Sequence, residues 1–150
     1  NESGWGQMIN QAGGHNVIES DMQVEDSDYA DAEAVINSNP DVVIKTVYRD
    51  QKDGIMADNY LPPEEADYIF AKEEMKAREG FSKMKAIEDD NIIMCSDFCL
   101  RGGGNTVGLA FFAKWLHPDL FEDFDAYEIF DQWMTEFQNM DAIEGHVYEG

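Results

Sequence analysis

The stretch AEAVINSNPDVVIKTV, residues 32–47, decides the fold of this chain. Its first half, Ala32 to Ser38, predicts a short helix closed by Asn39-Pro40, because the residue before a proline is pushed away from the helical conformation. Its second half, Val42 to Val47, is apolar and rich in β-branched residues, which is typical of a buried strand in a parallel sheet. Alternation of helix and strand is typical of an α/β domain.

Two further apolar runs extend this pattern. Ile92 to Cys95 predicts a second buried strand, and His15 to Ile18 predicts a weaker third one. The third run follows Gly13-Gly14, a pair that ends a helix running from about Trp5 to Gln11. Pro62-Pro63 opens another helix, at positions where the missing N–H groups carry no penalty.

The C-terminal third contains two apolar helices. Val107 to Leu116 is apolar nearly all round, so it predicts a helix enclosed between the sheet and a neighbour. That neighbour is the last helix, whose core residues follow the spacing i, i+3, i+4 and i+7: Phe130, Trp133, Met134 and Phe137. Together the elements predict an α/β fold, a three-layer α/β/α sandwich with a mostly parallel sheet, in which ligands meet the loops at the carboxyl ends of the strands.

The composition limits the possible function classes. With 150 residues, of which 43% are hydrophobic, the chain has the size of one packed domain. Its 10 basic and 32 acidic residues give a net charge of -22, which repels nucleic acid and anionic lipid and excludes a nucleic-acid partner. No apolar run in the sequence approaches the roughly 18 residues that a membrane span needs.

Three segments carry recognisable motifs. SGWGQMINQAGGHNV runs from Ser3 to Val17, EAVINSNPD from Glu33 to Asp41, and AKWLHPDLF closes a segment that runs from Arg78 to Phe121. In this order they resemble a Gly-rich loop with an AGG-x-N turn, an E-x-V-L-x-x-x-P-D-x-I-I pattern and an A-K-x-x-x-P-x-x-F pattern. The family with these patterns is the class III periplasmic binding proteins, which carry ferric siderophores, haem and cobalamin. The resemblance covers most of the chain.

The resemblance implies that residues 1–150 form a single C-terminal lobe of a solute-binding protein. We therefore expect the N-terminal lobe and the linking helix to lie outside this sequence. In the family, two lobes close on a solute and deliver it to the permease subunits of an ABC importer. The resemblance implies an extracellular or periplasmic protein, membrane-anchored at full length, that performs no enzymatic reaction and has no cofactor or metal site of its own. Its expected ligand is a metal chelate: a ferric siderophore, haem or a corrinoid.

Three loops of this lobe face the solute in the family, and they correspond to residues 3–6, 46–49 and 97–101 of this chain. The resemblance assigns ligand binding to six side chains: Trp5, Tyr48, Arg49, Asp97, Phe98 and Arg101. Tyr48 and Arg49 also follow a buried strand directly, where α/β sheets place binding groups, although Arg49 could equally begin a solvated loop. The third loop is the most informative, because SDFCLR at residues 96–101 resembles the S-D-W-x-x-R of a cobalamin-binding member.

The residue types in this third loop suit a large chelate. The Phe98 ring offers a flat apolar surface to a macrocycle or a catecholate, and Arg101 can hold a carboxylate or phosphate with two parallel hydrogen bonds. Arg101 also precedes Gly102 to Gly104 and a helix start, where free N–H groups favour anions. Simpler interpretations stay open, since Asp97 and Arg101 could pair with each other and Trp5 could pack on the core.

Glu33 is a different kind of site. In the family, the glutamate at this position of the E-x-V-L pattern is one of two, one per lobe, that dock on arginines of the importer's membrane subunits. The resemblance therefore implies that Glu33 docks on the transporter. An acid in the first turn of a helix also interacts favourably with the helix dipole, so a purely structural role stays open.

The two cysteines do not indicate a metal or redox site. Cys95 and Cys99 form C-x3-C, which is neither a structural zinc site nor the C-x-x-C of redox proteins. A catalytic thiol at Cys99 would need a nearby histidine, and the three histidines show no spacing that supplies one. Two alternatives to transport stay open: an α/β enzyme domain that uses Cys99, and a surface domain that binds another protein.

Overall fold

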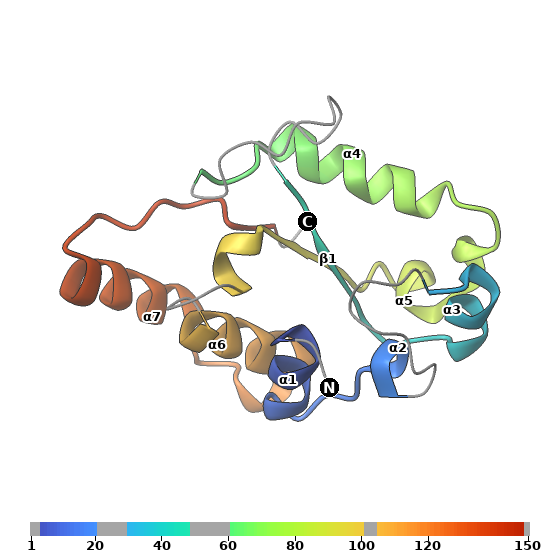
Figure 1. Ribbon diagram of the computed structural model, residues 1–150, viewed down its shortest axis with the longest axis horizontal. Helices are drawn as coiled ribbons and strands as arrows, with labels where there is room; N and C mark the ends of the chain where they lie inside the picture. The colour runs from blue at the N-terminus through green and yellow to red at the C-terminus, as the bar shows by residue number, and fades with distance from the viewer. Residues whose placement is uncertain (1–3, 21–29, 49–60, 101–104, 149–150) are drawn as a thin grey trace.

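A small mixed sheet forms the middle layer of the fold. The computed structural model describes residues 4–20, 30–48, 61–100 and 105–148 (Figure 1). In this part of the chain the strands are β1 (Val43–Thr46), β2 (Ile92–Cys95) and β3 (Val147–Tyr148), in the order β1-β2-β3. β1 and β2 are parallel, with Val43 opposite Ile92 and Thr46 opposite Cys95. β3 is antiparallel to β2, with Cys95 opposite Val147.

Helices cover both faces of this sheet. One face carries α1 (Gly4–Gln11), α6 (Asn105–Leu116) and α7 (Ala126–Gln132), and the other carries α3 (Ala32–Ser38), α4 (Glu65–Lys76) and α5 (Lys85–Glu88) (Figure 1). The strand residues alternate between the two apolar clusters: Ile44 and Cys95 belong to the first, and Val43 and Met94 to the second. The predicted α/β class and three-layer architecture are therefore confirmed.

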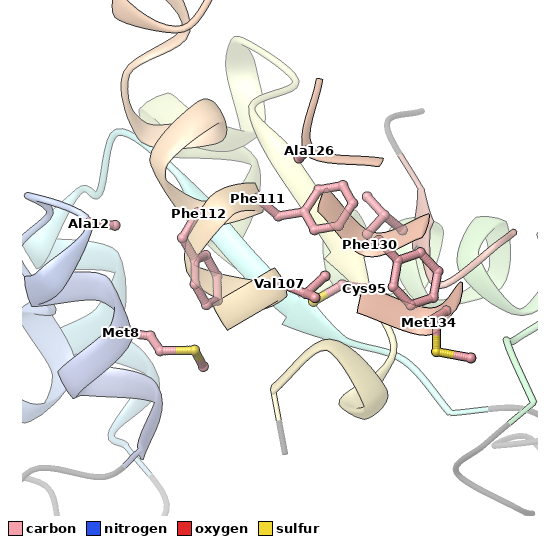
Figure 2. Close-up of a cluster of buried hydrophobic side chains, with 10 residues drawn as sticks. Met8, Ala12, Cys95, Val107, Phe111, Phe112, Ala126, Phe130 and Met134 are labelled. Atoms are coloured by element: carbon pink, nitrogen blue, oxygen red, sulfur yellow. The ribbon is translucent and has the colours of Figure 1, made fainter. Parts of the chain in front are cut away.

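The first cluster confirms the predicted enclosed helix. Phe111 and Phe112 of α6 are 1% and 0% exposed, and Phe130 of α7 and Cys95 of β2 pack in the same cluster (Figure 2). Burial of two phenylalanines on neighbouring positions of one helix requires partners on two sides, which here are α1 and α7. α6 is therefore the central element of this layer.

One residue of the predicted core stripe lies outside the core. Phe130 and Met134 are buried, but Phe137 is 72% exposed. The cause is the backbone, because residues Trp133–Gln138 form η6, a π-helix. A π-helix has more residues per turn than an α-helix, so the i+7 position rotates away from the buried face. The prediction that Phe137 belongs to the core is wrong for this reason.

The predicted strand at His15 to Ile18 is also wrong. Residues Val17–Ser20 form the short helix α2, and the third strand of the described sheet is β3, which adds a short antiparallel pair to the parallel pair of β1 and β2. The side-chain oxygen of Asn16 accepts a hydrogen bond from the Ile18 N–H (3.2 Å). Asparagine favours such local bonds at helix starts, and this bond outweighs the β-propensity of a short apolar run.

Short 3-10 turns complete the described elements: η2 (Phe81–Lys83), η3 (Asp97–Leu100) and η5 (Pro118–Leu120). Among the described residues, no helix is both long enough and apolar enough to cross a bilayer. The predicted helix after Pro62-Pro63 is α4, which begins at Glu65, and the Glu64 N–H donates to the Asp67 carboxylate at 3.0 Å. η3 matters most for function, because it follows the carboxyl end of β2.

Candidate ligand-binding site

The described parts of two predicted solute loops, residues 46–48 and 97–98, lie at one end of the sheet. β1 and β2 are parallel and in register, so the residues after Thr46 and after Cys95 leave the sheet at the same end. Tyr48 follows β1 and is half-buried, while Asp97 and Phe98 open η3 directly after β2. The structure thus places Tyr48 and the Asp97-Phe98 pair on neighbouring strand ends.

Trp5 lies in the first turn of α1. α1 and α6 run side by side in the same direction. Near the start of α1, the ring of Trp5 lies 6.0 Å from that of Phe112. After the ends of both helices, the ring nitrogen Nε2 of His117 lies 2.9 Å from the Ala12 carbonyl oxygen. α6 comes after the loop at the carboxyl end of β2, so the start of α1 points toward the same end. Trp5 is half-buried against the first cluster, which agrees with its simpler interpretation as a packing residue and leaves ligand contact a prediction.

Asp97 is buried rather than displayed. Its residue is only 4% exposed, at the first position of η3. Burial of a carboxylate away from water costs free energy unless polar groups of the protein contact it. Contact between Asp97 and a solute stays a prediction, and in this conformation only a small edge of the residue reaches the surface.

The Phe98 ring is part of an aromatic cluster. It stacks on the His146 ring, with centroids 4.5 Å apart and an angle of 23° between the planes. It also meets Phe130 and Trp133 edge to face, at 6.0 and 6.2 Å. One face of the ring is therefore already occupied, and a flat ligand could stack only from the opposite side.

A buried serine-histidine pair lies behind this loop. Ser96 and His146 are 4% and 2% exposed, and the Ser96 hydroxyl oxygen lies 2.7 Å from Nδ1 of His146. Burial lowers the pKa of His146 from 6.5 to about 4, so its imidazole is neutral near pH 7. Nothing in the sequence near either residue signals this pair, which the pairing of β3 with β2 brings together.

Several predicted site residues lie outside the described residues. These are Arg49, Arg101, the loop residue Ser3 and the side chain of Cys99. Their assigned or alternative roles stay predictions. Among the residues that the structure describes, no three His, Cys, Asp or Glu side chains come close enough to hold a metal ion.

Glu33 is exposed in the first turn of α3, well away from η3 (Figure 1). The turn after α3 is fixed firmly to α5. The Lys85 N–H donates to the Asn39 side-chain oxygen at 2.7 Å, the Ala86 N–H donates to the Pro40 carbonyl at 3.2 Å, and the Lys85 ammonium pairs with Asp41. Docking by Glu33 stays a prediction, but its helix is rigidly mounted and its carboxylate faces solvent.

A cavity of about 470 Å³ lies at the opposite end of β1 from these loops. Its walls come from the end of α1, from α2, α3 and the start of β1, with Val43, Ile44 and Met84 among the apolar lining residues. Neither Tyr48 nor Asp97 lines it. We place the candidate solute site at the carboxyl ends of the strands and not in this cavity, because the loops carry the polar and aromatic groups that suit a chelate.

No protein-family model and no curated protein matches the sequence. Solved structures do match. The TroA-like periplasmic binding protein FepB from Veillonella parvula matches over 97% of this chain and 41% of its own, with a TM-score of 0.81 and 20% sequence identity. The molybdate-bound periplasmic binding protein MolA of a Haemophilus influenzae ABC transporter matches over 92% of this chain and 37% of its own, with a TM-score of 0.65 and 17% identity.

This chain spans less than half of the length of either protein. The similarity extends over nearly all of the present sequence, including both helix layers and the sheet between them. The chain therefore has the fold of part of a class III, TroA-like periplasmic solute-binding protein, as its three motif segments predicted.

Proposed function

We propose that this chain is the C-terminal lobe of the solute-binding component of an ABC importer, acting outside the cytoplasm. The observation that carries the proposal is the convergence of Tyr48, Asp97 and Phe98 at the carboxyl ends of β1 and β2, in a fold shared with two periplasmic binding proteins. Ligands of open α/β sheets bind at this end. Half of the binding surface comes from this lobe, and a second lobe supplies the other half.

The proposed ligand is a metal chelate, that is, a ferric siderophore, haem or a corrinoid. The aromatic side chains near the strand ends, Trp5, Tyr48 and Phe98, suit a broad planar or aromatic ligand. The resemblance of SDFCLR to the loop of a cobalamin-binding member favours a corrinoid among the three. MolA binds molybdate, so an inorganic oxyanion is the second candidate and belongs in the same test.

The proposed partner of the lobe is the importer's permease, and Glu33 is the docking residue. Glu33 is an exposed acid on a helix whose following turn is anchored at Asn39, Pro40 and Asp41, so its charge lies on a surface that the fold holds in place. A fixed charge on a partner-facing surface steers association with a basic partner. The Glu33 surface and the solute loops lie on different parts of the lobe, so docking and solute binding can be tested separately.

Titration of tryptophan fluorescence in the full-length protein tests the ligand proposal. The probes are cyanocobalamin, haemin, ferrichrome, a ferric catecholate siderophore and sodium molybdate. We expect saturable quenching by one of the chelates. Asp97→Asn should weaken binding of that chelate, whereas Asp89→Asn should not, because Asp89 is exposed at the amino end of β2. If none of the chelates binds, the proposed ligand class is wrong, and binding of molybdate alone would replace it with an oxyanion.

A further inference from the structure

The segment between α7 and the end of β3 crosses the carboxyl end of the sheet. It begins at Asn139, which ends the π-helix with a φ of 52°, and it continues into β3. On its way it is tied to α4, where the Tyr68 hydroxyl donates to the Gly145 carbonyl at 2.9 Å. The Tyr68 and Tyr148 rings stack at 5.2 Å. This segment, residues 139–148, is called the return segment below.

His146 of the return segment contacts the loop after β2. The Ser96 N–H donates to the His146 carbonyl at 2.7 Å, and the Ser96 hydroxyl lies 2.7 Å from the His146 Nδ1. The His146 ring also covers one face of Phe98 at 4.5 Å. A single residue thus makes a backbone bond, a side-chain bond and a ring contact to Ser96 and Phe98.

These contacts set the conformation at the start of η3. The Ser96 hydroxyl that meets His146 also accepts a hydrogen bond from the Phe98 N–H at 3.3 Å. The imidazole therefore holds the serine rotamer, and the serine in turn holds the first turn of η3. Asp97 lies between the two contact points, so its direction depends on the same bonds. A side-chain network without water competition has a well-defined geometry.

We propose that His146 is a positioning residue for the solute loop, which fixes Ser96, Asp97 and Phe98 in the conformation that receives the chelate. The solute part of this proposal rests on the proposed function. His146 has no direct contact with solute in this scheme, because it is 2% exposed and lies behind Phe98. Nδ1 of His146 bonds Ser96 and the ring face stacks on Phe98, so a substitution can remove either contact while the other stays.

Two variants separate these effects. His146→Asn places an amide where Nδ1 stands and retains a partner for Ser96, but it loses the ring. His146→Phe retains the ring that stacks on Phe98, but it leaves the buried Ser96 hydroxyl without its partner. Ser96→Ala removes the same bond from the other side, together with the hydroxyl that accepts from the Phe98 N–H. His117→Ala is the control. His117 also makes a hydrogen bond to a residue far away in sequence, with Nε2 2.9 Å from the Ala12 carbonyl oxygen, but it lies at the end of α6 that is remote from the solute loop.

Amide hydrogen exchange of the full-length protein without solute is the first measurement. Loss of the buried bond between Ser96 and His146 should raise exchange at Phe98 about tenfold in His146→Phe. Ser96→Ala should raise it at least as much, because it also removes the acceptor of the Phe98 N–H. His146→Asn should restore most of the protection, and His117→Ala should leave Phe98 unchanged. The proposal is overturned if Phe98 exchanges equally in wild type and His146→Phe, or if His117→Ala accelerates Phe98 as much as His146→Phe does.

Affinity for cyanocobalamin, haemin and ferrichrome is the second measurement. If wild type binds one of them, we expect His146→Phe to weaken it about tenfold and His146→Asn to recover most of the loss. Unchanged affinity in His146→Phe would overturn the solute part of the proposal. If wild type binds none of these probes, the proposed ligand fails while the exchange data still decide whether His146 positions the loop, so the two failures are distinguishable.

Discussion

Burial of His146 should make the stability of this fold depend on pH between about 4 and 6.5. The folded protein holds the imidazole at a pKa of about 4, against 6.5 for an unperturbed histidine, because desolvation disfavours its charged form. Below pH 6.5 the unfolded chain takes up a proton that the folded protein excludes, so acid favours unfolding. The contribution of the neutral imidazole is thus complete above pH 6.5 and is lost as the pH falls through 6.5 toward 4.

The size of the effect follows from the two pKa values. Each tenfold difference in proton affinity is worth about 1.4 kcal/mol, so the full span from 6.5 to about 4 corresponds to at most about 3.5 kcal/mol. Acidic residues also titrate at the low end of this range, and their protonation relieves repulsion in a chain of net charge -22. A direct comparison of wild type with a variant that lacks the imidazole cancels most of that background.

The assay is urea unfolding of wild type and His146→Asn at several pH values from 7.5 down to 4.5, followed by tryptophan fluorescence. We expect the stability advantage of wild type over the variant to shrink by about 2 kcal/mol across this range. A difference between the two proteins that stays constant with pH would refute the reasoning. It would mean that the folded protein tolerates the charged imidazole, through water or a carboxylate that reaches it.

Three further predictions address docking, core and backbone. Glu33→Arg should abolish solute uptake by cells and leave solute affinity unchanged, with Glu65→Arg on α4 as the control, and a loss of affinity would contradict the docking role. Phe130→Ala should lower the free energy of unfolding by about 3–5 kcal/mol, because Phe130 is buried. Phe137 is 72% exposed, so Phe137→Ala should change that free energy by less than about 0.5 kcal/mol. Equal losses for the two variants in urea unfolding would contradict the π-helix. Gly80→Ala should destabilise the folded protein by at least about 1 kcal/mol in thermal unfolding, because Gly80 has a φ of 83° and a Cβ there would lie 2.7 Å from the Ile36 side chain. An unchanged Tm would contradict this prediction.

The sequence predicted the parts of the fold that depend on local patterns. β1 lies in a run rich in β-branched residues, β2 is a continuous apolar run, and α6 is apolar nearly all round, so composition over a few residues is sufficient to find them. The errors at His15 to Ile18 and at Phe137 have local causes of a different kind. A helix-starting bond from Asn16 and a π-turn after Trp133 change the backbone without any change in apolar periodicity.

β3 was beyond prediction because it has only two residues and pairs with a strand more than 50 positions earlier in the chain. Val147 and Tyr148 have no strand pattern of their own, and their pairing depends on Met94 and Cys95. The order of helices and strands therefore fixed the layers of the fold but not the last strand of the sheet. The orientation of the loop after β2 depends on that strand.

The same register explains why the solute loop was located in the sequence while its support was not. Tyr48 and Asp97 follow predicted strands, so their placement needs only the rule that parallel strands end together. Cys95 lies opposite Val147 in an antiparallel pair of strands. In such a pair the residue after Cys95 lies opposite the residue before Val147, so Ser96 meets His146. A two-residue strand supplies few backbone bonds, so side-chain contacts must help to hold its register. The Ser96 bond and the Phe98 stack of His146 are such contacts, so loss of both should weaken β3 and the solute loop together.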